Sequence, residues 1–218
     1  MAHRRHLNSA RGGFSLIEVL ISITILAILL TSVTQVGSQT SAAYDTSAAR
    51  LERELEAQRA LENIVAALTA ASSSTFVPDP VGELGTDDLT YRTIESMAGA
   101  VTTWSDDNRI VLQLEPGELD NGVDDDLDGL TDERQVVLIL DEGQANQRAR
   151  VLIKGVAEVG VGEGMNLADD DGDGVVDESG FCIRRENGVL FVELAVQGRV
   201  GDAPVFTVEA ETRTALRN

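Results

Sequence analysis

The first long apolar block of the chain covers residues 14–36, in which Glu18 is the single charged residue. A helix of this length, at about 1.5 Å per residue, is long enough to cross a hydrocarbon core of about 30 Å. The pattern therefore predicts a transmembrane helix near the N-terminus.

Residues 37–71 are expected to continue this helix as an amphipathic extension. Charged residues of both signs alternate with apolar residues that recur at steps of three and four, namely Leu51, Leu55, Leu61, Ile64, Val65 and Leu68. No proline interrupts residues 14–77, and the serines at 72–74 followed by Pro78 and Pro80 end the helix. We expect the apolar stripe to pack on a globular head.

After residue 80 the apolar pattern changes to period two and short runs, which are typical of strands. The strands predicted are 89–94, 109–114, 135–140, 150–156, 181–185, 189–196 and 205–211. Residues 135–140 and 150–156 are expected to form a hairpin, and Asn187-Gly188 is a strong turn signal between two further strands. Residues 97–104 fit no pattern, and Trp104 is expected to anchor a core or an interface.

The fold class predicted is α+β, with a long N-terminal helix packed on an antiparallel β-sheet head. The predicted divisions are a leader at 1–13, a transmembrane helix at 14–36, an amphipathic extension at 37–71 and a β-rich head at 72–218.

The segment around the start of the apolar block reads RGGFSLIEVL at residues 11–20, after a basic stretch with Arg4, Arg5 and Arg11. It resembles the class III signal of type IV pilins and type II secretion pseudopilins. The resemblance implies that a prepilin peptidase cuts after Gly13 and that the new N-terminal residue, Phe14, is N-methylated. A usual secretory signal is cut after its apolar region, whereas this site precedes it, so the anchor would be kept. The alternative is a plain single-pass anchor.

Glu18 is the fifth residue of the chain that this cleavage would produce. A carboxylate inside a membrane costs about 2.5–3.5 kcal/mol on insertion scales, so a partner is expected. The resemblance implies that the partner is the N-terminal amine of a neighbouring subunit, which would set register during assembly. The alternative is that Glu18 lies close enough to the headgroups to be hydrated.

Two acidic segments repeat 45 residues apart, NGVDDDLDGLTDE at 121–133 and NLADDDGDGVVDE at 166–178. In the spacing D-x-D-x-D-G, alternate aspartates converge on one ion and the residue after the glycine offers its carbonyl. Hard oxygen ligands without thiolate or imidazole favour calcium. The predicted ligands are Asp124, Asp126, Asp128, Leu130 and Asp132 in the first loop, and Asp169, Asp171, Asp173, Val175 and Asp177 in the second.

Both calcium-type loops depart from the EF-hand, which has a glutamate at its twelfth position and helices at its ends. The twelfth residues here are Gln135 and Gly180, while Glu133 and Glu178 occupy the tenth. A bidentate ligand would have to come from elsewhere, or the sites would be weak, with dissociation constants of about 0.1–1 mM. Residues 115–133 hold nine acids and residues 163–178 hold seven, with no base in either segment. We expect one or two structural calcium ions, the alternative being plain acidic turns.

The charge balance limits the possible functions. The formal net charge is -20, or -23 without the leader, which excludes nucleic acid as a natural partner. Both histidines, His3 and His6, lie in the leader, so the processed chain would lack imidazole chemistry. Cys182 is the one cysteine and is expected to be a buried small hydrophobe. No enzymatic activity is expected, unless acids such as Glu158 and Glu163 face each other across a cleft.

The sequence therefore predicts a minor pseudopilin or minor pilin, most similar in size and helix-then-strand order to the J-type pseudopilins. The resemblance implies other pilins or pseudopilins, prepilin peptidase and the inner-membrane assembly platform as partners. It also implies a single-pass inner-membrane location, with the head in the periplasm or on the cell surface within a filament. The alternative is a calcium-dependent adhesin displayed through a pilin signal, although eight aromatic residues make a poor carbohydrate platform.

Overall fold

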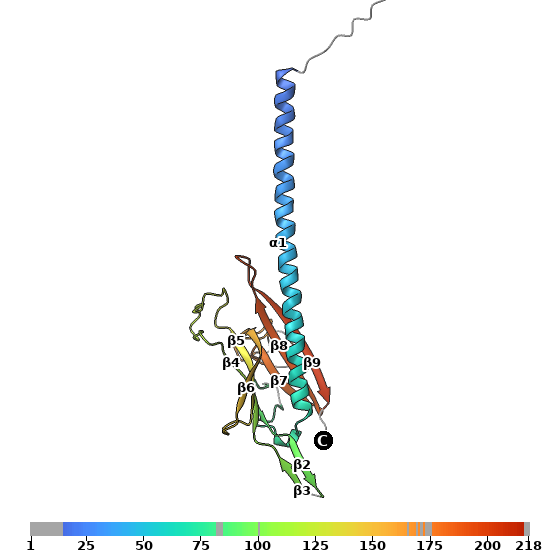
Figure 1. The fold of residues 1–218 in the computed structure, drawn as a ribbon, viewed down its shortest axis with the longest axis vertical. Coiled ribbons are helices and arrows are strands. Elements are labelled where there is room, and N and C mark those ends of the chain that lie inside the picture. The colour runs from blue at the N-terminus through green and yellow to red at the C-terminus, as the bar shows by residue number, and fades with distance from the viewer. Residues whose placement is uncertain are drawn as a thin grey trace, which may run out of the picture. The chain divides into compact units, whose positions relative to one another are not determined.

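The computed structural model describes residues 15–81, 85–99, 101–164, 166–168, 170, 172 and 176–215. One long helix is followed by a short 3-10 turn and a series of strands (Figure 1). The elements are α1 (Leu16–Thr69), η1 (Ser73–Thr75), β1 (Asp88–Tyr91), β2 (Ile94–Ala98), β3 (Val101–Trp104), β4 (Asn108–Leu114), β5 (Arg134–Leu140), β6 (Arg148–Val156), β7 (Phe181–Glu186), β8 (Val189–Gly198) and β9 (Phe206–Ala215). The α+β layout predicted from the sequence is confirmed.

α1 runs without interruption through both compact units of the chain, residues 1–45 and 46–218. In the first unit every described residue is exposed, and the helix contains a segment long and apolar enough to cross a membrane. The hydroxyls of Ser22, Thr24 and Thr31 each donate to the backbone carbonyl four residues earlier, at 2.8 Å. These polar side chains are therefore satisfied within the helix, as a lipid environment requires.

In the second unit, the helix presents a narrow buried stripe to the head. Leu61, Ile64 and Leu68 are buried as predicted, whereas Leu51 and Leu55 are exposed. Two alanines, at positions 57 and 60, are fully buried about two turns and one turn before Ile64. The buried stripe of the helix begins with these two small side chains.

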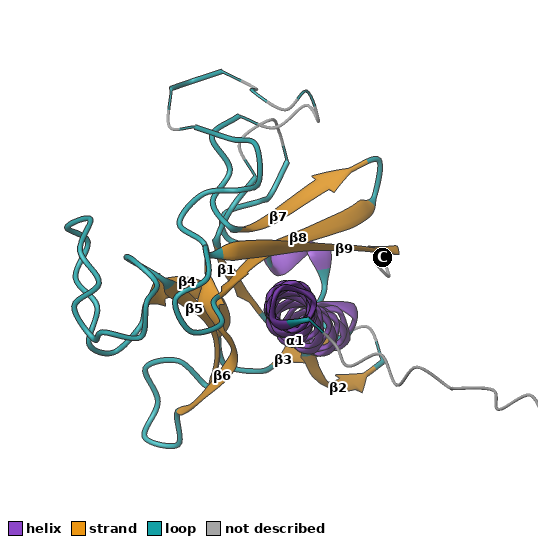
Figure 2. Cartoon of the chain, turned by 90° about the horizontal axis from the view of Figure 1, so that it is seen from above, coloured by secondary structure: helices purple, strands orange, loops and turns teal. Residues whose placement is uncertain are grey.

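The main sheet is antiparallel and has the strand order β1-β4-β5-β6-β8-β7, with β9 also paired to β8. Its two parts are β1-β4-β5-β6 and β7-β8-β9, and Val156 of β6 pairs with Val196 of β8 where they join. Viewed along the helix, the second half of α1 lies beside both parts (Figure 2). The core accordingly contains residues from the helix and from both parts, including Ile64, Ile110 and Phe181.

The strand predicted at 89–94 is wrong in one respect, because the chain leaves the sheet at Arg92. The backbone N–H of Arg92 donates to Thr75 Oγ1 at 3.0 Å, and its carbonyl accepts from Ser72 N at 3.3 Å. The chain then forms a separate two-stranded sheet from β2 and β3. This hairpin contains the segment that fitted no sequence pattern, and Trp104 is half-buried at its end.

The two hairpins predicted from the sequence are confirmed. β5 pairs with β6, and β7 pairs with β8 across Asn187 and Gly188. Both turn residues have positive φ, 49° and 80°, as the tight turn requires. Cys182 is buried in β7, and burial raises the pKa of its thiol to about 12, so it behaves as the small hydrophobe that was expected.

Candidate functional site

The signal segment is described from Ser15 onward, so Gly13 and Phe14 lie outside the described residues. Glu18 lies in the first turn of α1. The backbone N–H of Ser15 approaches Glu18 Oε2 at 3.4 Å, and the N–H of Glu18 approaches Ser15 Oγ at 3.3 Å. This reciprocal pair is a capping box, which fixes the start of the helix and places the carboxylate near its positive end.

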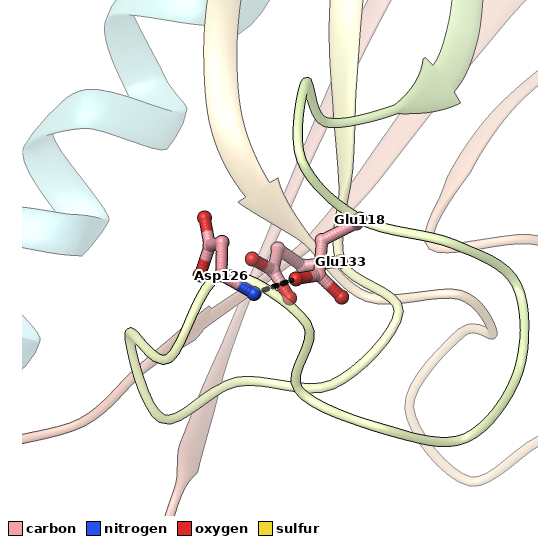
Figure 3. Close-up of side chains that lie close together, drawn as sticks. All are labelled: Glu118, Asp126 and Glu133. Carbon is pink, nitrogen blue, oxygen red and sulfur yellow. Dashed lines mark hydrogen bonds between the residues drawn. The ribbon is translucent and has the colours of Figure 1, made fainter.

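The first acidic loop, residues 115–133, connects β4 to β5 and is organised around Glu118. One oxygen of this buried carboxylate accepts the backbone N–H groups of Asp125 and Asp126, at 3.1 and 2.9 Å. The other oxygen accepts the N–H of Asp132 at 3.2 Å. Figure 3 shows Glu118 beside Asp126, with the bond between them. Glu118 therefore holds the two ends of the loop together.

Asp132 closes the neck of the same loop, which is the place where residue 132 near its end meets residues 121 and 122 near its beginning. Its two carboxylate oxygens accept the backbone N–H groups of Asn121 and Gly122, at 3.0 and 2.7 Å. The side chain is buried, and the backbone is left-handed with φ 51°. The sequence predicts Asp132 as a metal ligand, and the structure shows that both of its oxygens are used in this neck.

Asp124, Asp126 and Asp128 lie together, with one ligand oxygen from each within 4.8 Å of the others. Each uses one oxygen to accept a backbone N–H of the loop, from Gly129 at 2.9 Å, from Asp128 at 3.1 Å and from Leu130 at 2.9 Å. The other oxygen of Asp124 is buried and has no hydrogen-bond partner within the described part of the chain. The alternate aspartates therefore converge, in the way that the D-x-D-x-D-G spacing predicts.

Glu133 is the unexpected member of the site. Its side chain is 1% exposed, and neither carboxylate oxygen has a hydrogen-bond partner among the residues that the structure describes. One of these oxygens lies within 4.8 Å of oxygens from Glu118 and Asp126, and Figure 3 shows the three side chains together. Burial raises the pKa of Glu133 to about 7, and the carboxylates of Asp128, Glu118 and Asp126 add to this rise.

Asp126 belongs to both groups, since it lies near Asp124 and Asp128 on one side and near Glu118 and Glu133 on the other. Oxygens from the loop and from the start of β5 thus surround one region. A buried carboxylate with no partner is costly, and a cation is the kind of ligand that would compensate several converging carboxylates. The predicted carbonyl ligand Leu130 has a side chain that is 4% exposed, which anchors this part of the loop.

In the residues that are described, the second acidic loop has the same set of hydrogen bonds from carboxylates to backbone N–H groups, which we call its hydrogen-bonded frame. Glu163 accepts the N–H groups of Asp170 and Asp177 at 2.9 and 3.2 Å, as Glu118 does in the first loop. Asp177 accepts the N–H groups of Asn166 and Leu167, both at 2.8 Å, as Asp132 does. The remaining predicted ligands lie outside the described residues, namely Asp169, Asp171, Asp173 and Val175.

Glu118 and Glu163 were not predicted as members of the sites. A sequence signal was present, because Gly-Glu occurs at 117–118 and again at 162–163, again 45 residues apart. The repeat therefore begins before the asparagine with which the predicted repeat starts. Glu133 was noticed at the tenth position, but only the structure shows that its carboxylate points into the loop.

A further acidic group consists of Asp120, Asp132 and Glu158. The guanidinium group of Arg134 lies beside two of these acids. Arg134 Nη2 lies 3.2 Å from Glu158 Oε1 and 3.6 Å from Asp120 Oδ2. Glu158 is thus paired with arginine, and the Glu163 carboxylate binds backbone N–H groups of its own loop. Both acids that were considered for glycoside hydrolysis therefore take part in structural contacts.

Comparison with known families gives one match. Residues 8–34 match the family model for the prokaryotic N-terminal methylation motif, so the chain carries a class III signal of the type IV pilin kind. No curated protein and no solved structure matches the chain. The match covers the segment from which the resemblance was drawn.

Proposed function

We propose that this chain is a minor pseudopilin or minor pilin, a structural subunit of a type II secretion pseudopilus or a type IV pilus. The observation that carries the proposal is the N-terminal methylation motif, which leads directly into one continuous helix, Leu16–Thr69. The later part of this helix is built into the core of a β-sheet head. A subunit of this kind acts by its position in an assembly, and its partners would be other pilins, prepilin peptidase and the inner-membrane assembly platform.

In this proposal the apolar part of α1 anchors the precursor in the inner membrane and later packs among the helices of neighbouring subunits. The head would lie in the periplasm or within a filament on the cell surface. Glu18, held in its capping box with Ser15, would meet the N-terminal amine of a neighbour. Two charges that are each costly in an apolar medium would then compensate each other and set the register.

The head would be stabilised by calcium in the first acidic loop. Asp124, Asp126 and Asp128 would supply carboxylate oxygens, and Glu133 would supply the bidentate ligand that the sequence pattern lacked at the twelfth position. Leu130 would contribute its carbonyl. Calcium is favoured because the donors are all hard oxygens and no histidine or cysteine lies in the loop.

Mass spectrometry of the intact protein from membranes tests the proposed function. A mass that begins at N-methylated Phe14 is expected in cells with prepilin peptidase, and a mass that includes the leader is expected in cells without it. Gly13→Val should block cleavage, while Gly12→Ala, one residue away, should leave it intact. A chain that keeps its leader in peptidase-containing cells would overturn the filament role and leave a membrane-anchored domain.

A Glu18→Ala variant separates processing from assembly. Because the cut precedes Glu18, we expect a processed and membrane-bound chain that fails to enter filaments when pilins of the same system are expressed. Normal incorporation of this variant would contradict the role proposed for Glu18, without affecting the cleavage result.

A further inference from the structure

β6 has an open edge inside the head. It pairs with β5 along its length, whereas its pairing with β8 is limited, among the described residues, to Val156 with Val196. Among the described residues, β5 is therefore the only strand that pairs with the backbone of residues 149–153. An unpaired strand edge presents N–H and C=O groups that can pair with another extended chain.

A groove of about 440 Å³ lies along this edge, between residues 150–154 of β6 and the face of α1 that carries Arg53, Glu56, Arg59 and Asn63. All of these residues belong to the unit formed by residues 46–218. The volume falls in the range of protein ligand pockets. The groove also has apolar walls, since Val151 is 44% exposed and Ile153 lies buried beneath.

The groove is basic, although the chain as a whole carries a formal net charge of -20. Arg53, Arg59, Arg150 and Lys154 all line it. Arg53 pairs with Glu56 at 3.0 Å, and Lys154 pairs with Glu115. Arg59 and Arg150 have no ion pair among the described residues, so two exposed guanidinium groups lie beside an unpaired edge.

We propose that this groove binds an extended acidic segment of a neighbouring subunit as an added strand on the edge of β6. Backbone hydrogen bonds to residues 149–153 would give affinity, and carboxylates on alternate residues of the segment would face Arg59 and Arg150. The proposal rests on the filament role for the source of the segment, but its recognition chemistry is a property of the head alone. Charged residues on an edge also prevent unwanted strand pairing, and the test separates that role from docking.

The test uses the full chain in detergent and a synthetic peptide of about eight residues that alternates Glu and Val, roughly 26 Å long when extended. Titration followed by fluorescence anisotropy gives its affinity, and hydrogen exchange with the peptide bound gives protection at single amides. We expect new protection within residues 149–153 at the alternate amides whose N–H groups face away from β5, and we expect Arg59→Glu and Arg150→Glu each to weaken binding about 10-fold or more. Arg148→Glu is the matched control, because it lies on the same strand and changes the net charge equally, but does not line the groove.

The outcomes are distinct. Equal weakening by Arg148→Glu would show non-specific attraction and overturn the proposal, as would binding that leaves amides 149–153 unprotected. A peptide that alternates Lys and Val should not bind, and a central proline in the acidic peptide should abolish the added strand. If the acidic peptide does not bind at all, the docking proposal is wrong and the arginines serve to keep the edge free. None of these results alters the mass test of N-terminal processing, so the two proposals can fail separately.

Discussion

The two acidic loops share one hydrogen-bonded frame and differ in how they are fixed to the head. In both, a glutamate accepts the backbone N–H of the final aspartate, from Asp132 to Glu118 and from Asp177 to Glu163. The first loop also has Glu115, three residues before Glu118. Glu115 accepts the N–H of Gly155 in β6 at 2.6 Å and pairs with Lys154.

The residue that corresponds to Glu115 in the second loop is Gly160, which has no side chain to reach a strand. The first loop has another external contact, because Arg199 Nη1 donates to the carbonyl of Gly129 at 3.2 Å. The first loop is thus attached to the sheet by its own Glu115 carboxylate and by the side chain of Arg199. We infer that the first loop is the better preorganised cation site, since ordering a loop on binding reduces affinity.

Glu133→Gln is expected to have the largest effect. Loss of the buried charge should weaken calcium binding by about 100-fold, or roughly 2.7 kcal/mol. At calcium concentrations near 100 times the dissociation constant, the wild-type head should gain about 2.7 kcal/mol, or roughly 5–11 °C in Tm. Isothermal titration calorimetry and thermal unfolding of the full chain in detergent measure both quantities.

The matched variant is Glu178→Gln in the second loop, which should leave the tighter site unchanged. The change in the free energy of unfolding of Glu133→Gln without calcium gives a second test. Because the two oxygens of Glu133 have no partner, Glu133→Gln should be at least as stable as wild type in EDTA. A variant that is equally destabilised in EDTA and in calcium would show that Glu133 has a packing role and would contradict the metal site.

Glu118→Gln should have the next largest effect, through the frame of the loop. Glutamine keeps one acceptor oxygen and has an NH₂ group in place of the other. The variant therefore loses either the contacts with the N–H groups of Asp125 and Asp126 or the contact with the N–H of Asp132. Removal of such a positioning contact typically costs about 10–100-fold in metal affinity. Glu163→Gln is the partner experiment, and it should affect only the weaker site. Calorimetric titrations that show equal losses at both sites would contradict a separate frame for each loop.

Glu115→Gln tests the attachment of the first loop to β6. The amide oxygen can still accept from Gly155, while the ion pair with Lys154 is lost, so we expect about 1 kcal/mol of destabilisation in urea unfolding. Lys154→Met removes the same ion pair but leaves the buried Glu115 carboxylate with its charge and the Gly155 N–H, so it should destabilise the head more than Glu115→Gln does. A smaller loss in Lys154→Met than in Glu115→Gln would show that the charge of Glu115 does not depend on Lys154.

Much of the fold could be predicted, because its signals are local. The proline-free helix and the Asn187-Gly188 hairpin follow from residues that are close in sequence. The departure of the chain at Arg92 could not be predicted, since it depends on hydrogen bonds to Thr75 and Ser72. The exposure of Leu51 and Leu55 also depends on where the sheet begins to cover the helix.

The acidic cluster could be predicted to the extent that its carboxylates repeat in sequence. The spacing of Asp124, Asp126 and Asp128 correctly indicated that their carboxylates converge. The direction of Glu133 could not be read from spacing alone, because it is set by the start of β5 and by the neck of the loop at Asp132. Counting from an EF-hand pattern directed attention to the twelfth position, where this loop has no carboxylate.

Leu127→Asn should have the smallest effect, and it tests a local difference between the loops. Leu127 is 85% exposed and has φ 64°, while the second loop has Gly172 at the same position with φ 84°. Leucine is strained in this left-handed conformation and asparagine tolerates it, so the substitution should stabilise the calcium-free head by about 0.5 kcal/mol. Val123→Asn, at an exposed position of the same loop without positive φ, should bring no gain in urea unfolding. Equal gains from both variants would indicate a general benefit of polarity, whereas a gain from Leu127→Asn alone would show that the first loop keeps a strained residue where the second has glycine.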